Sequence, residues 1–178
     1  MKVILFMAMT INGIIAREND KEDFLSDRNW KQFCALAKDV GCFVIGRRTY
    51  EVVKSLYKDY NFDDIDADRI IVSANPNFDP GDGHIVANSP KDAVRKASSK
   101  GFRKIILTGG STLNSAFIKA GLIDEIIVDI EPAILGKGVK IFAEADFYKR
   151  LKLKRIKKLP EGIIQLHYEV IKSRRRRQ

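Results

Sequence analysis

Short apolar runs separated by polar turns recur along the chain. Runs of this length, bounded by glycine, proline and polar residues, are typical of strands buried inside a sheet. The pattern predicts strands over residues 2–9, 42–45, 69–73, 84–87, 104–107 and 124–131. The first run is apolar almost throughout, which favours a central strand that is covered on both faces.

Helical patterns lie between the strands. Ser26 is a good N-cap, and the apolar residues that follow it recur at helical spacing up to a glycine. The sequence predicts helices over residues 27–39, from 47 onward, over 90–99 and after the glycine pair 109–110. The alternation of strand and helix is typical of a parallel sheet with right-handed crossovers.

Two stretches depart from this alternation. Residues 14–25 are rich in charge, so we expect a long surface loop of the kind that serves as a lid or binding loop. Residues 151–159 and 163–172 read as a hairpin that would finish the sheet with antiparallel strands. The expected organisation is one domain over residues 1–172 followed by a basic tail, residues 173–178.

Composition narrows the class of protein. The chain has 178 residues, 45% of them hydrophobic, and its formal net charge is +9. It contains no apolar run near the roughly 20 residues that cross a bilayer, so we expect a cytoplasmic protein without a membrane partner. Two cysteines and two histidines show no zinc spacing, which predicts no metal site. No aromatic residues interleave with Arg174–Arg177, so the charge favours an anionic small ligand over nucleic acid.

The two strand-to-helix junctions at glycines carry the candidate chemistry. Gly46-Arg47-Arg48-Thr49 and Thr108-Gly109-Gly110-Ser111-Thr112 each place free backbone N–H groups at a helix start. Such groups, with two guanidinium groups beside them, suit a phosphate. The alternative for the first junction is a glycine turn followed by a solvated basic helix. Ligands of open α/β sheets sit beyond the carboxyl ends of the strands, where both junctions would lie.

A resemblance to a known family follows from motifs in order along residues 2–172. The motif residues are Ala8, Asn12, Ile15, Glu18-Asn19, Asp27, Trp30, Gly46 to Glu51, Thr108 to Gly110, Gly121 to Ile126, Pro132, Leu135 to Gly138 and Phe142. Their order and spacing resemble the dihydrofolate reductase superfamily. The later motifs are similar to the reductase domain of the riboflavin deaminase-reductase group. The resemblance implies a single-domain, three-layer α/β fold with a mixed, mostly parallel sheet of about eight strands.

The resemblance also implies NADPH as the cofactor. Gly46, Arg47, Arg48 and Thr49 would hold the adenosine-side phosphates, and Ser73 would lie beside the adenosine ribose or its 2′-phosphate. Thr108, Gly109, Gly110, Ser111 and Thr112 would surround the pyrophosphate, and Ala8 and Ile15 would border the nicotinamide. Reductase domains of the riboflavin group pair as dimers, so a homodimer is expected.

On the substrate side, the resemblance assigns Asn12, Asp27, Trp30 and Asp129. Asp27 matches the acid that helps protonate the pterin in dihydrofolate reductases, and Asp129 matches a strand position that faces this acid. The alternative for Asp27 is a carboxylate that complements the helix dipole.

The sequence also departs from the riboflavin group. That group usually carries an aspartate where Asn12 stands and often a glutamate where Thr108 stands. We therefore favour a reductase of a pteridine or related heterocycle. The riboflavin precursor, a ribosylaminopyrimidinone phosphate, is the alternative substrate. A nucleic-acid-binding protein that keeps the fold without the chemistry is an alternative of another class.

Overall fold

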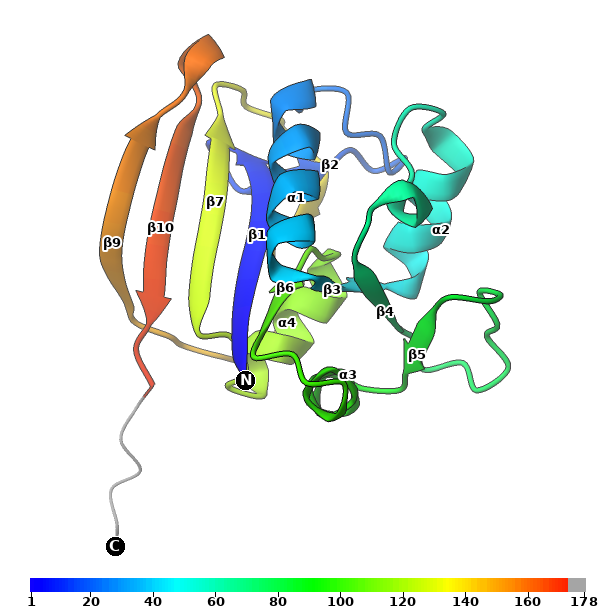
Figure 1. Cartoon of the computed structure of the whole chain (residues 1–178). Helices are drawn as coiled ribbons and strands as arrows, with labels where there is room; N and C mark the ends of the chain where they lie inside the picture. The colour runs from blue at the N-terminus through cyan, green and yellow to red at the C-terminus, as the bar shows by residue number, and fades with distance from the viewer. Residues whose placement is uncertain (173–178) are drawn as a thin grey trace, which may run out of the picture.

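The computed structural model describes residues 1–172 and shows one eight-stranded sheet with helices on both faces (Figure 1). The predicted basic tail, residues 173–178, lies outside the described residues. The sheet order is β5 (Ile85–Ala87), β4 (Asp68–Val72), β3 (Cys42–Gly46), β6 (Lys104–Leu107), β1 (Lys2–Thr10), β7 (Glu125–Glu131), β10 (Ile164–Val170) and β9 (Leu151–Lys158). The first six strands of this order, from β5 across to β7, pair in parallel with their neighbours, whereas β10 pairs antiparallel with both β7 and β9. The predicted mixed sheet and its C-terminal hairpin are thus confirmed.

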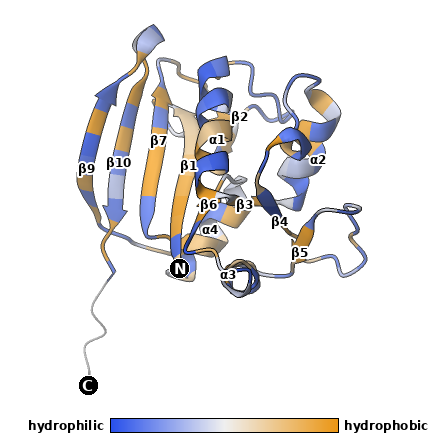
Figure 2. Cartoon of the chain, viewed as in Figure 1, coloured by the Kyte–Doolittle hydropathy of each residue, from blue (hydrophilic) through white to orange (hydrophobic). Residues whose placement is uncertain are grey.

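The sheet has a hydrophobic core on each face, because successive residues of a strand point to opposite faces. Two α-helices cover each core. In β1, Ile4 and Phe6 pack in the core under α1 (Asp27–Val40) and α2 (Arg47–Leu56). Val3 and Leu5 pack in the core under α3 (Pro90–Ser99) and α4 (Ser111–Lys119). The central strands are hydrophobic along their length (Figure 2), as strands covered on both faces must be. The three-layer architecture is therefore as predicted.

The predicted loop over residues 14–25 is wrong for its first three residues. Ile14–Ala16 form strand β2, which pairs antiparallel with β8 (Val139–Lys140) in a separate two-stranded sheet. All three residues of β2 are buried, so their apolar side chains belong to the domain. The charged residues that follow β2 made the whole stretch resemble a polar loop, so the sequence pattern did not indicate this pairing. Residues 17–26 do form a loop, and it runs across the same end of the sheet as the two glycine junctions.

The two glycine junctions lie side by side. Gly46 N–H donates to the Gly109 carbonyl at 2.8 Å, and Thr108 N–H donates to the Val44 carbonyl at 3.0 Å. These bonds extend the parallel pairing of β3 and β6 up to the starts of α2 and α4. Two helix N-termini therefore face the same space beyond the carboxyl ends of the strands. Short 3-10 helices, η1 (Phe62–Asp64) and η2 (Pro160–Gly162), complete the fold, and η2 makes the predicted hairpin turn.

No helix within residues 1–172 has both the length and the apolar character needed to cross a membrane.

Candidate cofactor and substrate site

A cleft of about 580 Å³ opens beyond the carboxyl ends of β1, β3, β4 and β6. This volume is in the range of about 300–1,000 Å³ that is usual for small-molecule sites. Ten of the predicted cofactor residues line it: Ile15, Gly46, Arg47, Arg48, Thr49, Ser73, Thr108, Gly110, Ser111 and Thr112. The tertiary structure thus brings together in one cavity residues that are far apart in the sequence.

The floor of the cleft allows a ligand to approach the backbone closely. A Cβ atom added to Gly110 would lie 2.7 Å from Thr49 Oγ1, which is too close for any side chain. The N-caps of α2 and α4 are Gly46 and Gly110, so neither helix has a side-chain cap for its free N–H groups. No acidic residue lies in the first turn of either helix. These two helix starts therefore suit the phosphates of a dinucleotide.

The adjacent arginines point in different directions. Arg48 Nη2 lies 2.9 Å from the Asp20 carboxylate, so Arg48 joins α2 to the loop 17–26. Arg47 lies over the Phe78 ring at 5.9 Å and 3.9 Å from Glu51 Oε1. Arg47 is therefore turned toward the β4 side of the cleft. The two guanidinium groups therefore lie at different parts of the rim of the cleft.

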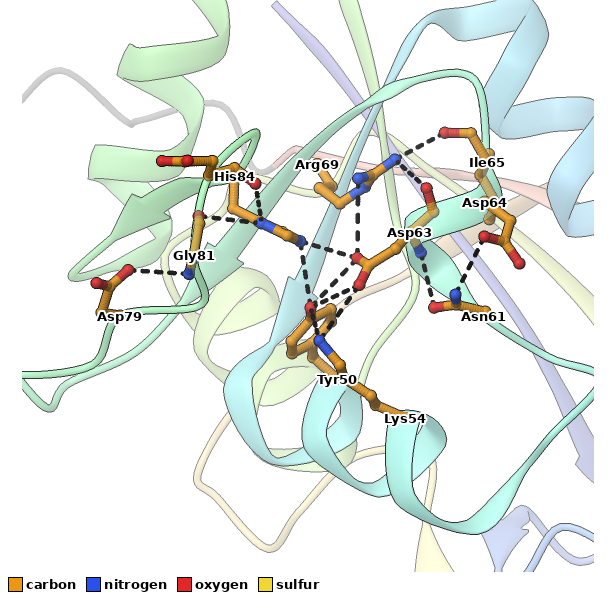
Figure 3. Close-up of polar contacts among 11 residues, drawn as sticks. Tyr50, Lys54, Asn61, Asp63, Asp64, Ile65, Arg69, Asp79, Gly81 and His84 are labelled. Carbon is orange, nitrogen blue, oxygen red and sulfur yellow. Dashed lines mark hydrogen bonds and ion pairs between the residues drawn. The ribbon is translucent and has the colours of Figure 1, made fainter.

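A network of polar side chains behind α2 fixes this side of the cleft (Figure 3). The Asp63 carboxylate accepts hydrogen bonds from Tyr50 Oη at 3.0 Å and from His84 Nε2 at 2.8 Å, and Arg69 and Lys54 lie beside it. Burial by itself would raise the pKa of Asp63, but the hydrogen bonds from His84 and Tyr50 outweigh it and lower the pKa. The network ties α2 to η1, β4 and the loop before β5, and so holds the helix that carries the arginines.

Ser73, predicted beside the adenosine ribose, is buried at the edge of the cleft. Its hydroxyl accepts the Asn75 N–H at 3.1 Å, so it is already used within the turn that follows β4. Gly109 lies under the cleft with φ at 92°, and the peptide between Gly109 and Gly110 is cis.

A second, smaller cavity of about 70 Å³ lies deeper, between β1 and α1. Ala8, predicted beside the nicotinamide, and Trp30, predicted on the substrate side, both line it. Five residues line both the cleft and this inner cavity: Met7, Ile15, Glu22, Thr49 and Thr108. The two spaces therefore meet at these residues.

Aromatic side chains form the far wall of the inner cavity. Trp30 lies 5.1 Å from Tyr60, 5.4 Å from Phe62 and 5.8 Å from Phe33, measured between ring centroids. The rings are inclined to one another by 30° to 65°, and together they form an apolar wall beside which a planar heterocycle can pack.

The structure places Asp27 outside the inner cavity. Asp27 is exposed, borders an outer groove and accepts a hydrogen bond from the Tyr60 hydroxyl. This hydrogen bond, together with burial, raises the pKa of Tyr60 to about 12. The polar α1 side chain that lines the inner cavity, beside Trp30 and Phe33, is Asn29, which also borders the outer groove. Two positions along a helix correspond to a rotation of about 200°, and Asp27 borders the outer groove alone.

The expected pairing of Asp129 with Asp27 is wrong. Asp129 is 1% exposed and accepts hydrogen bonds from Asn29 Nδ2 at 3.3 Å and Gln165 Nε2 at 2.9 Å. Burial raises the pKa of Asp129. Its partner on α1 is therefore an amide, not a second carboxylate.

Asn12 also lies apart from both cavities. Its side chain accepts the Thr10 hydroxyl at 2.8 Å and donates to the Leu135 carbonyl at 2.7 Å. Asn12 thus joins the end of β1 to the loop before β8.

Sequence reasoning missed Glu22, which lines the cleft, the inner cavity and the outer groove. Its backbone N–H donates to the Tyr57 hydroxyl at 2.6 Å. Burial raises the pKa of Glu22 to about 7, and the charge of Asp20 adds to the effect. Glu22 stands in a run of charged residues that is indistinguishable from a solvated loop, so the sequence contains no signal that singles it out.

Solved structures define the class of this fold. The chain aligns with a Shewanella sp. PV-4 protein, assigned by its name to riboflavin biosynthesis, at a TM-score of 0.82 and 25% identity, covering 97% of this chain and all of that one. Dihydrofolate reductase from Enterococcus faecalis aligns at a TM-score of 0.70 and 18% identity, covering 95% of this chain and 96% of that one. The architecture is that of the dihydrofolate-reductase-like proteins.

The chain belongs to the RibD C-terminal domain family, whose model matches residues 1–165. It is also 30% identical over 173 residues to the uncharacterized protein YwjB of Bacillus subtilis (strain 168), covering 94% of this chain and 97% of that protein. The resemblance drawn from the sequence motifs is confirmed.

Proposed function

We propose that this protein is an NADPH-dependent reductase that transfers a hydride to a pteridine or a related heterocycle. The observation that carries the proposal is a cleft with two uncapped helix starts and two arginines, which meets an aromatic cavity at shared lining residues. A dinucleotide can extend along the cleft while its reactive ring lies where the two spaces meet. Membership in a family named for a riboflavin-pathway protein supports an oxidoreductase.

The cleft residues fit the cofactor part by part. The free N–H groups at the start of α4, residues 110–112, would bind the pyrophosphate, and Arg47 and Thr49 would bind the adenosine-side phosphates. Ala8 and Ile15 would border the nicotinamide, because Ile15 lies where the cleft and the inner cavity meet and Ala8 lines the inner cavity. When bound, the cofactor supplies the hydride, and the protein orients the reactants and excludes water.

The inner cavity selects the substrate. Its aromatic wall suits a planar ring, and Asn29 offers amide hydrogen-bonding groups beside that wall. A pteridine meets these requirements of ring shape and hydrogen bonding, and it would extend from the inner cavity of about 70 Å³ into the adjoining spaces. The pyrimidinone phosphate of riboflavin biosynthesis is the second candidate, and the family membership favours it.

Parallel incubations test the proposal. The purified protein, with NADPH, receives dihydrofolate in one incubation and the ribosylaminopyrimidinone phosphate in another, and oxidation of the reduced nicotinamide is followed by absorbance. We expect oxidation with one of the two substrates and none without substrate. Failure to bind NADPH would contradict the proposal. Salt-sensitive binding of RNA or DNA would instead support the nucleic-acid alternative.

We further propose that the protein forms a homodimer through the free edge of its sheet. All eight residues of β9 are exposed, including Leu153 at 47% and Ile156 at 57%. Five of the eight are Lys or Arg, which disfavour edge-to-edge pairing of strands, so the exposed apolar side chains Leu151, Leu153 and Ile156 would make the contact with a second copy. Figure 2 shows β9 at the edge of the sheet, with both hydrophobic and hydrophilic segments. Light scattering should report a dimer that Ile156→Lys converts to a monomer, while Ile134→Lys, in an exposed loop, has no effect. A monomeric wild-type protein would exclude the dimer.

As an oxidoreductase of small molecules, the protein is expected to reside in the cytoplasm, which fractionation of cells producing a tagged protein tests.

A further inference from the structure

We infer that Glu22 is the catalytic acid that protonates the substrate during hydride transfer, a role that the sequence motifs had assigned to Asp27. The inference rests on the proposed reductase function and identifies the proton donor of that same site. It draws on the position of Glu22 in the cavities, the hydrogen bonds of the neighbouring acids and the charges around Glu22.

Glu22 occupies the position that a proton donor requires. Among the described residues that line the inner cavity, Glu22 alone carries a carboxyl group. It also lines the cleft and the outer groove, so one side chain borders the cofactor space, the substrate space and a route to water. The hydrogen bond from its backbone N–H to Tyr57 anchors this part of the loop to the end of α2. A general acid must lie within hydrogen-bond reach of the atom it protonates, and Glu22 borders the space for that atom.

The other carboxylates around the site are already hydrogen-bonded or paired. Their partners are Tyr60 for Asp27, Asn29 and Gln165 for Asp129, Ser26 for Glu131, Arg48 for Asp20 and Arg17 for Asp23. The Glu22 carboxyl group has no hydrogen bond or ion pair with any side chain in residues 1–172. It is therefore free to bond to a substrate.

The charges around Glu22 favour a proton on its carboxyl group at neutral pH. Burial raises the pKa of Glu22 to about 7, and the Asp20 carboxylate adds to the effect. The titratable and charged groups that surround it are Arg17, Asp20 and Asp23 in its own loop, Asp27 on α1, Arg48 on α2, and Tyr57, Lys58, Asp59 and Tyr60 in the segment after α2. Arg48 and Arg17 are paired with Asp20 and Asp23, and no cation in residues 1–172, including the nearby Lys58, lowers the pKa of Glu22. A donor with a pKa near the working pH is the most effective general acid.

The proposed step is balanced in atoms and electrons. A hydride from the reduced nicotinamide adds to the carbon of a C=N or C=O bond in the substrate, and the π electrons move to the nitrogen or oxygen. That atom takes the proton as the O–H bond of Glu22 breaks, and the substrate is reduced by two electrons. The Glu22 carboxylate then regains a proton from water through the outer groove. The nicotinamide leaves in its oxidised form.

Three variants test the assignment in the full chain. Glu22→Gln removes the proton and keeps the shape, Glu22→Asp restores a shorter acid, and Glu18→Gln is the matched control. Glu18 is exposed, lies in the same loop and borders neither cavity. For each variant, NADPH affinity is measured by fluorescence, and turnover is measured with dihydrofolate and with the ribosylaminopyrimidinone phosphate. The Glu22 carboxyl group is titrated by carbon NMR, as the difference between wild type and Glu22→Gln.

We expect Glu22→Gln to bind NADPH as wild type does but to turn over roughly 10²- to 10⁴-fold more slowly, the usual contribution of a positioned acid. Glu22→Asp should recover part of the rate, and Glu18→Gln should match wild type. Near-wild-type turnover in Glu22→Gln would overturn the assignment and leave the reductase function standing. If wild type binds NADPH but reduces neither substrate, the NMR titration of the Glu22 carboxyl group tests the assignment instead. A carboxyl group titrating near pH 7 supports the assignment, and one titrating at the ordinary value of 4.5 overturns it.

Discussion

At the scale of single residues, helix geometry separates the acidic candidates at the start of α1. Asp27 and Asn29 differ by two positions and both border the outer groove, yet only Asn29 also lines the inner cavity. The residue type that suggests catalysis is thus on the outer side, while an amide stands beside Asp129. The role of Asp27 as an acid remains a prediction from the family motif, and Glu22 competes with it.

The substitution Asp27→Asn separates these two candidates. If Glu22 is the acid, Asp27→Asn keeps turnover within a few-fold of wild type and lowers the melting temperature slightly, because the hydrogen bond with Tyr60 changes and the first turn of α1 loses its negative charge. If Asp27 is the acid, turnover falls roughly 10²- to 10⁴-fold while NADPH affinity is retained. Turnover and thermal unfolding of the purified variant provide the measurement, and Glu18→Gln is again the control.

Gly110 permits a second test at this scale. The added methyl group of Gly110→Ala would lie 2.7 Å from Thr49 Oγ1, so either the Thr49 side chain rotates or the starts of α2 and α4 move apart. Forced overpacking typically costs about 1–3 kcal/mol, and here it would also misplace the phosphate site. We expect lower stability and weaker NADPH binding, with partial recovery of stability in Gly110→Ala/Thr49→Ala. Calorimetry and fluorescence titration measure the two effects, and an unperturbed single variant would argue against this close contact.

At the scale of elements, α2 carries two arginines with different neighbours. Arg48 is bound to the loop 17–26 through Asp20, whereas Arg47 is turned toward Phe78 on the β4 side. The polar network around Asp63 holds this helix in place, so the arginine positions depend on η1 and the loop before β5 as well. One helix start thus borders the proposed cofactor cleft and also holds the loop 17–26.

This arrangement predicts different effects for the two arginines. Arg47→Ala should weaken NADPH more than NADH, because a charge-assisted bond to phosphate contributes roughly 1.5–3 kcal/mol, or about 10- to 150-fold in affinity. Arg48→Ala should weaken both cofactors by a similar, smaller factor, because it releases the loop. Affinities of both variants and of the double variant for both cofactors provide the test. Equal losses for NADPH and NADH in Arg47→Ala would show that Arg47 does not bind the 2′-phosphate.

At the scale of the whole molecule, the loop 17–26 links folding stability to pH. The pKa of Glu22 rises from 4.5 to about 7 on folding, so the folded state holds a proton that the unfolded state has lost. The stability that this proton contributes is complete below pH 4.5 and disappears as the pH rises through 7. Asp63 and Glu125 have lowered pKa values, so their contributions change only below this window.

The variant Glu22→Gln should therefore flatten the stability profile. The difference in melting temperature, variant minus wild type, should increase as the pH rises from 4.5 to 7, because the variant has no charge to bury. Thermal unfolding of wild type, Glu22→Gln and Glu18→Gln across this range measures the difference. Parallel profiles for all three proteins would show that Glu22 is ionised in the folded state throughout.

The sequence by itself determined the architecture and identified ten of the residues that line the cleft. Apolar runs, helical spacing and glycine junctions are local signals, because each depends on only a few consecutive residues. The junctions at Gly46 and Gly109–Gly110 were therefore predictable, as was the hairpin of β9 and β10. Parallel pairing then brings the strand ends together, because neighbouring strands finish at the same edge of the sheet.

Only the tertiary structure decided the substrate side. The β2–β8 pairing joins segments distant in the sequence, and no local pattern records such a partner. Glu22 acquires its raised pKa from burial by other elements, and the same residue in a solvated loop would be an ordinary carboxylate. Likewise, the rotation of α1 against the sheet, and not the sequence motif, placed Asn29 in the cavity and Asp27 outside it. These features depend on how whole elements pack, so they emerge only when the chain is folded.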